Sequence, residues 1–306
     1  AIDGDLILAS KLMPTSFGIG LQKKYSSGKP LIVDIDDWEL GFFYHSGFWG
    51  GVGRFLNFSN PNGLPYVWRI ERLVGEADAV SVSNRFLQEK FKGALLPHCR
   101  DTSVLDPQKF NPDEMKERIG LADKKVVMFL GTPRPHKGLD DLLAAFKKIG
   151  DLNVKLVIIG AENQQEFLKR VDHSIRESVV VLPKTSFQKL PELLSAADIL
   201  AIPQRRTSDS VGQIPARLFD AMSMAKPIIA TRVSDIPEVL DNCGYLVDPN
   251  KPSQLADAIK YILNHSDEAR VKGDAARARC RQKYDIHNLE SGLSGLIEQV
   301  IANKAN

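Results

Sequence analysis

Cysteine is scarce in this sequence of 306 residues, and it never takes the spacing of a metal or disulfide motif. The three cysteines, Cys99, Cys243 and Cys280, are an odd and scattered set without a C-x-x-C pair. Such a set excludes a disulfide framework and a zinc site built on paired cysteines. A reducing compartment fits best, so we expect a cytoplasmic protein.

Net charge and long apolar runs are lacking as well. Lysine and arginine number 40 against 38 aspartates and glutamates, which gives no reason to expect a nucleic-acid partner. No apolar run approaches the roughly 20 residues that span a bilayer. The one basic stretch, residues 270–283, alternates with alanine and predicts a solvated helix face. Peripheral contact with acidic lipids at the inner face of a membrane is the alternative for this stretch.

From about residue 124 onward, strand-like runs alternate with helical patterns. The runs VVMFLG (126–131) and KLVIIG (155–160) enclose LDDLLAAFKKI (139–149), whose apolar residues fall on one helical face. Continuous apolar runs are typical of strands that are buried on both faces of a parallel sheet. The pattern therefore predicts a doubly wound α/β domain in this part of the chain.

The first hundred residues repeat this alternation in a shorter form. The chain begins AIDGDLILA, without Met, and soon enters a strand, so we expect this amino-terminal α/β domain (1–107) to be incomplete. Residues 40–68 are irregular and rich in Gly, Phe, Trp and Tyr, which fits an acceptor platform, a membrane-facing loop or a packed loop equally. The polar, proline-punctuated stretch 101–115 predicts a linker with the domain boundary near residue 108.

The stretch FLGTPRPHKGLDDLL ends a predicted strand and enters a predicted helix. Amides at a helix N-terminus carry partial positive charge and lack partners, which makes this loop a candidate anion site. Arg134 and Lys137 add two cations to it. The loop lacks both the Walker pattern and the G-x-G-x-x-G pattern. Taken alone, it could equally be a loop with solvated cations.

A second helix entry of the same kind is SVGQIPARLFDAMSMAKPIIA. Pro215 suits the first helical turn, and Arg217 and Asp220 stand at i and i+3 on one face. Taken alone, they predict no more than a surface ion pair. Two such entries at the carboxyl ends of strands in one parallel sheet could bracket a diphosphate.

These two stretches, followed by GYLVDPNKPSQLADAI, resemble the group 1 glycosyltransferases, which are family 4 of the retaining enzymes and have the GT-B fold. The resemblance runs from about residue 5 to 284 and is most specific in residues 126–260. It implies two Rossmann-like domains that face a cleft, with a donor domain at about 108–285 and an acceptor domain (1–107) before it. It also implies a final helix near 289–303, within a segment 286–306 that crosses back to the first domain.

By this resemblance, Lys137 grips the diphosphate of a nucleotide sugar. The family usually has an arginine directly after Gly131, where this chain has Thr132, so the role passes to Arg134 in the same loop. The resemblance also implies donor-binding backbone amides in the turn after residue 212 and a base site near 181–184. The donor-binding residues it implies, besides Lys137, are Gly131, Thr132, Arg134, Lys184, Gln213, Ile214, Pro215, Ala216, Arg217 and Asp220.

The family's usual pair of glutamates is half present. Asp220 matches the second glutamate, which holds the ribose, and Gly212 stands where the first should touch the donor sugar. Asp209 is the candidate to reach in from the loop instead, with a catalytic role. The resemblance implies no metal and no cofactor, because cations and helix ends neutralise the leaving diphosphate.

An acidic cluster in LIVDIDDWE (31–39) follows a predicted strand. Carboxylates there could hold a metal, attack a phosphoryl group or position a sugar hydroxyl. Members of the family usually have a histidine at the position of Asp36, facing the donor sugar. This favours Asp36 as a catalytic, sugar-positioning residue, and it leaves Asp37 and Glu39 as acids that start a helix or pair within the loop.

The resemblance implies an enzyme that moves a hexose from a UDP-sugar or GDP-sugar to an acceptor hydroxyl and retains the anomeric configuration. The acceptor could be a saccharide, a lipid-linked saccharide or a small molecule, which fits polysaccharide or glycolipid biosynthesis. Two alternatives stay open. One is a nucleotide-sugar epimerase of the same fold, and the other is a non-catalytic nucleotide-sugar binding protein, which the absent first glutamate favours.

Overall fold

A computed structural model describes residues 4–46, 55–56 and 58–305. The chain divides into two compact units. The first unit holds the described residues up to His98, together with Thr207–Ile214 and the described residues from His287 onward. The second unit holds Cys99–Arg206 and Pro215–Ile286. Three residue ranges that are far apart in the sequence therefore build the first unit.

The first unit contains a four-stranded parallel sheet. Its strands lie in the order β1 (Ile7–Ser10), β2 (Leu31–Ile35), β3 (Ala79–Val82) and β4 (Ala94–Leu95). Its described α-helices are α1 (Ile19–Ser27), α3 (Leu64–Glu71), α4 (Arg85–Phe91), α9 (Ser208–Val211) and α14 (Ile286–Ala305). The core side chains of β2 and its neighbours are fully buried, as in Phe17, Leu31, Val33 and Leu87. The strand β2 thus delivers its polar carboxyl end, Asp34 onward, to one edge of the sheet.

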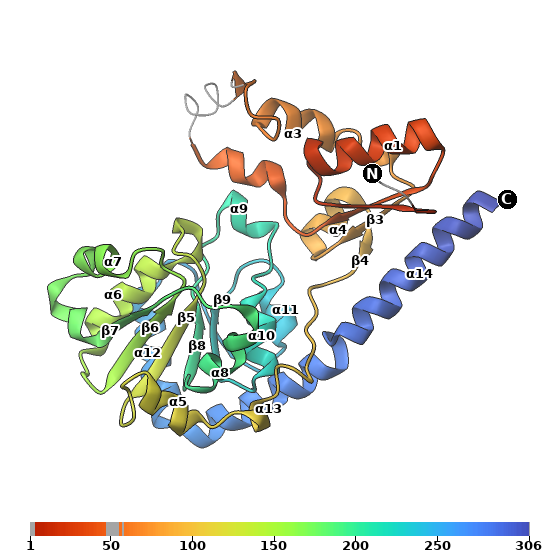
Figure 1. Ribbon diagram of the computed structural model, residues 1–306. Coiled ribbons are helices and arrows are strands. Elements are labelled where there is room, and N and C mark those ends of the chain that lie inside the picture. Colours follow the sequence, from red (N-terminus) through yellow and green to blue (C-terminus); the bar gives the residue numbers. More distant parts are fainter. Residues whose placement is uncertain (1–3, 47–54, 57, 306) are drawn as a thin grey trace. The chain divides into compact units, whose positions relative to one another are not determined.

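The second unit contains a six-stranded parallel sheet (Figure 1). Its strands lie in the order β10 (Tyr245–Val247), β9 (Ile228–Thr231), β8 (Ile199–Ile202), β5 (Lys125–Leu130), β6 (Val154–Ile159) and β7 (Val179–Leu182). The strand order reverses between β5 and β8. Ligands of doubly wound sheets bind outside the carboxyl ends of the strands at such a reversal. The predicted α/β class with parallel sheets is confirmed.

The helices of the second unit flank this sheet. They are α5 (Pro112–Arg118), α6 (Leu139–Ile149), α7 (Gln164–Arg170), α8 (Leu190–Ser195), α10 (Arg217–Ser223), α11 (Ile236–Leu240), α12 (Pro252–Asn264) and α13 (Ser266–Lys283). The apolar face of α6, with Leu142 and Phe146, is buried in one cluster with Leu255 and Ile259 of α12. Burial of each such side chain contributes about 1.5 to 3 kcal/mol. This packing fixes the position of the α6 N-terminus.

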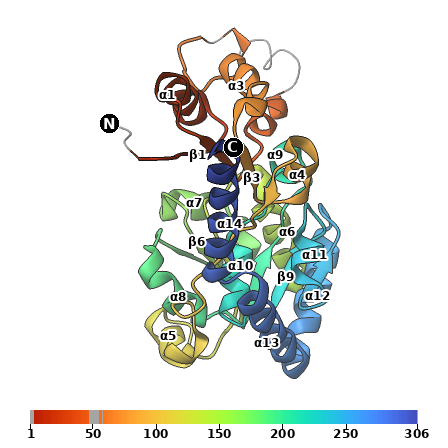
Figure 2. The same cartoon turned by 90° about the vertical axis from the view of Figure 1, so that its right-hand side faces the viewer.

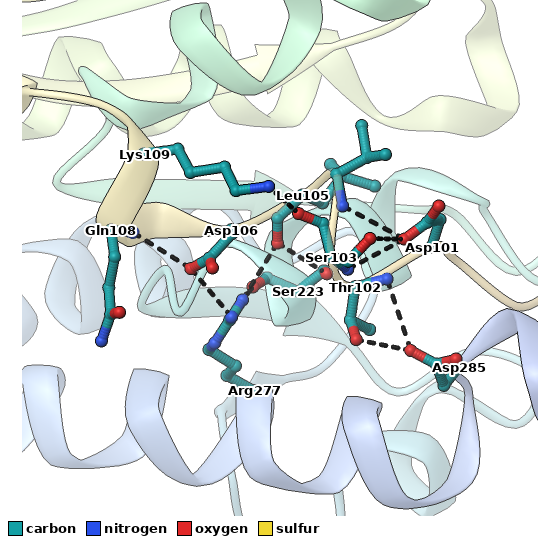
Figure 3. Close-up of polar contacts among 11 residues, drawn as sticks. Asp101, Thr102, Ser103, Leu105, Asp106, Gln108, Lys109, Ser223, Arg277 and Asp285 are labelled. Atoms are coloured by element: carbon teal, nitrogen blue, oxygen red, sulfur yellow. Dashed lines mark hydrogen bonds and ion pairs between the residues drawn. The ribbon is translucent and has the colours of Figure 1, made fainter.

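The predicted linker is bound to the second unit (Figure 3). The guanidinium of Arg277 on α13 donates to the carboxylate of Asp106 over 2.9 Å and to the backbone oxygens of Leu105 and Ser223. Thr102 donates from its amide and its hydroxyl to Asp285. Leu105 and Asp106 are thereby held against α13, and the second unit begins at Cys99.

The last helix, α14, follows α13 after a short break at Tyr284 and Asp285 (Figure 2). Its Gly292 lies against Leu96, where an added Cβ would come within 2.6 Å of the leucine Cδ2. No helix in the described part of the chain is long and apolar enough to cross a membrane. Of the aromatic stretch 40–68, residues 47–54 and 57 lie outside the described residues.

Candidate functional site

The loop after β5 brings cations to the carboxyl edge of the second sheet. The chain leaves β5 at Gly131, passes through a short 3-10 turn (Pro135–Lys137) and enters α6. A Cβ on Gly131 would lie 3.2 Å from Lys137 Nζ and 3.3 Å from Arg217 Nη1. Two cationic groups from different elements therefore lie beside the same glycine.

Two other glycines fix the path of this loop. Gly138 has φ 70°, and a Cβ there would lie 1.7 Å from the backbone oxygen of Pro203, so only glycine fits. Gly160, which follows β6, approaches the backbone of Gly131 so closely that its Cβ would lie 2.9 Å from the Gly131 carbonyl carbon. The neighbouring strands β8 and β6 thus hold the loop on both sides.

Arg217, the first residue of α10, is the most deeply buried cation of this group. Its side chain is 6% exposed, and its guanidinium lies 5.0 Å from the centre of the Phe129 ring. Its Nε and Nη2 donate no hydrogen bond to any residue that the structure describes. Burial lowers the pKa of Arg217 to about 10, although Asp220 opposes this shift. Buried guanidinium donors are normally satisfied, so this group is suited to an anionic ligand.

Lys137 is the second cation of this loop region. It makes no ion pair with any described residue, and burial lowers its pKa to about 8, helped by the charges of Arg217 and Arg134. Arg134 itself is exposed. A diphosphate beside Gly131 would supply an anionic partner for Lys137 and Arg217.

A hollow of about 340 Å³ opens next to this loop. It is lined by Thr132, Pro133, Ala161, Glu162, Asn163, Glu166, Phe167 and Arg170. The loops after β5 and β6 therefore leave room for a further part of a ligand at the carboxyl edge of the sheet. Lys184, predicted near the base, is exposed after β7.

Asp220 is buried in the first turn of α10 and is already paired. Its Oδ1 accepts a hydrogen bond from Arg100 Nε, and Arg100 Nη2 donates to the backbone oxygen of Ala216 over 3.1 Å. Arg100 thus clamps the N-terminal turn of α10. No motif in the sequence pointed to this partner, because Arg100 directly precedes the predicted linker (101–115) and lies 120 residues before Asp220.

The acidic cluster of the first unit surrounds a lysine. Lys11 Nζ lies 3.3 Å from Asp36 Oδ1, 3.1 Å from Asp37 Oδ2 and 3.3 Å from Glu39 Oε1. Burial opposes the charged form of Lys11, but the three carboxylates outweigh it and raise its pKa. Burial raises the pKa of Glu39, which Lys11 counteracts. The sequence analysis missed Lys11, which no motif connects to residues 36–39.

The segment Thr207–Ile214 packs within the first unit beside this cluster. Gln213 Nε2 donates to Asp37 Oδ1 over 2.8 Å, and Ser208 Oγ donates to the backbone oxygen of Gly41 over 2.9 Å. A Cβ on Gly212 would lie 2.5 Å from the Cβ of Trp38. Trp38 therefore leaves no room for a side chain at position 212.

The predicted site residues fall into the two units. Asp36, Asp209, Gln213 and Ile214 belong to the first unit, and the other predicted residues belong to the second. Asp209 accepts a hydrogen bond from the hydroxyl of Thr207, in the capping turn of α9. Within the second unit, Gly131, Lys137 and Arg217 come together.

Comparison with known proteins identifies first the class of fold. The protein Alr3699/HepE of Anabaena, solved in complex with UDP and glucose, has a TM-score of 0.76 at 17% identity, over 95% of this chain and 77% of that chain. Sucrose-phosphate synthase of Thermosynechococcus elongatus has a TM-score of 0.77 at 19% identity, over 98% of this chain and 74% of that chain. Two parallel α/β units of this kind define the GT-B class.

The sequence comparisons then point to one family within that class. Residues 124–265 match the family described as "Glycosyl transferases group 1". The GDP-mannose-dependent alpha-(1-6)-phosphatidylinositol monomannoside mannosyltransferase of Mycolicibacterium smegmatis is 28% identical over 224 residues, which are 68% of this chain and 59% of the relative. Together these matches support a relationship to the group 1 glycosyltransferases. The chain spans about 60% of the length of the first mycobacterial relatives.

Proposed function

We propose that this protein is a glycosyltransferase that moves a hexose from a nucleotide-diphosphate sugar to an acceptor hydroxyl and retains the anomeric configuration. The observation that carries the proposal is the pair of cations, the buried Arg217 and the half-buried Lys137, beside Gly131 at the strand-order reversal. The match of residues 124–265 to the group 1 glycosyltransferases supports it.

The donor diphosphate is bound by the two cations and by the loop after β5. Lys137 and Arg217 bind the diphosphate, and Arg134 approaches it from the exposed side of the loop. As the bond to the sugar breaks, negative charge develops on the leaving diphosphate, where each well-placed donor contributes roughly 2 to 4 kcal/mol. Cationic side chains thereby take the part that a metal ion would take, and the proposal includes no metal and no cofactor.

Residues around this centre bind the rest of the donor. Asp220 holds the ribose, with its orientation set by Arg100. The backbone of Gln213–Ala216 and the region of Lys184 contact the donor further out. In the first unit, Asp36 and Asp209 contact the sugars.

The donor is a UDP-sugar or a GDP-sugar, and the acceptor is a saccharide or a lipid-linked saccharide. One relative named above is GDP-mannose-dependent and acts on a phosphatidylinositol monomannoside, whereas the Anabaena structure contains UDP. An acceptor with a lipid anchor would place the protein in the cytoplasm with peripheral contact at the inner face of a membrane.

Calorimetric titration with UDP and GDP tests the diphosphate assignment. Lys137→Ala and Arg134→Ala should weaken nucleotide binding, Lys137→Ala by roughly 30-fold or more, because a partly desolvated charge contact is lost. Lys147→Ala is the matched control, since Lys147 lies on α6 but pairs with Asp172. Parent-like affinity in both loop variants would exclude the assignment.

Turnover separates the enzyme from a binding protein. The absent first glutamate, whose space Trp38 fills, favours the non-catalytic alternative. Incubation with UDP-sugars and GDP-sugars, with and without saccharide acceptors, should give transfer products with retained configuration. Nucleotide binding without any product would favour the binding protein, and a 2-epimer would favour the epimerase.

A further inference from the structure

Three carboxylates of the first unit converge as they would around a metal ion. One oxygen from each of Asp36, Asp37 and Glu39 lies within 4.8 Å of the others. Clusters of carboxylate oxygens at such separations are what Ca²⁺ and Mg²⁺ bind. Here the ammonium of Lys11 lies among them, at 3.1 to 3.3 Å from one oxygen of each acid.

The backbone at Lys11 points to a requirement for this side chain. Lys11 has φ 73°, in the left-handed region that glycine and asparagine tolerate better than lysine. Its amide donates to the backbone oxygen of Asp34 over 2.8 Å, and its own oxygen accepts from Met13 over 2.9 Å, so the turn is closed on both sides. The turn suits glycine better than lysine, and the contacts of the Lys11 ammonium with the three carboxylates explain why a lysine is present.

The other contacts of the cluster leave Asp36 dependent on Lys11. Gln213 supports Asp37 by its hydrogen bond over 2.8 Å. Oδ1 of Asp36 is buried and accepts no hydrogen bond from any described residue, so the ammonium is what faces it. The backbone oxygen of Asp36 is held by Ser83 Oγ over 2.6 Å, which fixes the main chain but not the carboxylate.

We propose that Lys11 is a built-in cation that takes the place of a divalent metal ion and holds the Asp36 carboxylate in its sugar-contacting position. Lys11 is thus a positioning residue, and this role rests on the proposed function of Asp36. Removal of Lys11 leaves three carboxylates that repel one another and a space between them. A divalent cation should enter that space, because three anionic oxygen ligands are already in place.

The first test is Mn²⁺ binding, measured by calorimetry and by electron paramagnetic resonance on the full chain. The parent should bind no Mn²⁺ at this cluster, and Lys11→Ala should bind it at one site. Lys11→Ala with Glu39→Gln should lose at least about tenfold in that affinity, since one ligand charge is removed. Lys24→Ala is the matched control, because Lys24 pairs with Asp78 in the same unit, and it should gain no site. A folded Lys11→Ala protein without a Mn²⁺ site would overturn the proposal.

The second test is activity. Lys11→Ala should lower kcat with acceptor at least about tenfold while UDP or GDP affinity stays within about twofold of the parent, because the diphosphate-binding cations Lys137 and Arg217 lie in the other unit. Mn²⁺ should restore part of the lost activity in Lys11→Ala and none in the double variant, and Lys11→Arg should retain most of it. Parent-like turnover in Lys11→Ala, or a loss that neither Mn²⁺ nor arginine repairs, would contradict the positioning role.

The Mn²⁺ titration and the activity assay can each fail independently of the other. The Mn²⁺ titration needs no turnover, so it decides the built-in cation even if the protein proves non-catalytic. If Lys11→Ala does not fold, the double variant removes one repelling charge and supplies the folded background. In that background, activity equal to that of Glu39→Gln alone would exclude a role for Lys11.

Discussion

The two charged clusters of this molecule have opposite electrostatic designs. In the first unit, three carboxylates share the ammonium of Lys11 as a counter-ion. In the second unit, Lys137 makes no ion pair with the described residues, and Arg217 leaves two buried nitrogens without an acceptor there. The first cluster carries its own counter-charge, whereas the second needs one from a ligand.

This difference explains which cluster should bind an anion. A buried charge without a partner costs free energy that the rest of the fold must offset. A ligand that supplies the missing charge recovers that free energy as affinity. In the first cluster the ammonium of Lys11 already occupies the position between the three carboxylates, so its groups are held in place without a bound ion.

The largest expected effect on stability comes from a bulky, charged side chain added beside the first cluster. Gly212→Glu places a glutamate where Trp38 leaves no room, and it adds an acid next to Gln213, whose amide donates to Asp37. Steric overpacking should lower the free energy of unfolding by about 2 to 3 kcal/mol. Denaturant unfolding of both proteins measures this difference.

Gly295→Glu is the control for that experiment. Gly295 is exposed on α14 in the same unit, and an added Cβ there meets nothing within 4 Å. The same substitution should therefore change stability by no more than about 1 kcal/mol. Equal losses in the two variants would mean that charge, rather than the contact with Trp38, is responsible.

A smaller effect is expected in the pH dependence of nucleotide binding. Lys137 has a lowered pKa of about 8 in the free protein, and a bound diphosphate should raise it. Below pH 8 this lysine is charged in both states and affinity is constant; above pH 8 binding must take up a proton, so affinity falls with rising pH by up to about tenfold per unit.

Lys137→Arg provides the comparison for this profile, because arginine stays charged throughout. Calorimetry from pH 7 to 9.5 should give a falling affinity in the parent and a nearly flat one in the variant. Identical slopes would assign the proton uptake to another group.

The smallest effect concerns stability without ligand. The folded state binds the Lys137 proton more weakly than the unfolded state does, so the charged lysine destabilises the fold below pH 8, and this cost fades as pH rises toward 10.5. Lys137→Met should raise the free energy of unfolding at pH 7 by up to about 1 kcal/mol, after allowance for solvent screening.

Lys11→Met is the opposite case, since it leaves three carboxylates without a cation and should destabilise the protein at the same pH. Thermal unfolding of the two variants side by side measures both signs. If both variants shifted in the same direction, the distinction between a cluster with its own counter-ion and a ligand-dependent cluster would be lost.

Local patterns predicted much of the fold and part of the site. Continuous apolar runs identified β5 and β6, and the periodic apolar face identified α6, because local periodicity reflects burial directly. The loop that ends at Lys137 was visible since a strand, a glycine and a helix follow one another in sequence. The helical pattern placed Arg217 on a helix surface and the resemblance implied donor binding, but its burial against Phe129 came from packing.

The sequence by itself determined the parallel α/β architecture and the position of the cationic loop at the carboxyl edge of a sheet. Only the tertiary structure decided which charges are matched. Lys11 meets residues 36–39 across a strand connection, Arg100 meets Asp220 from more than a hundred residues away, and Trp38 fills the space beside Gly212. Such contacts depend on how distant segments pack together, and neither the local hydrophobic periodicity nor the secondary-structure propensity of a segment determines that packing.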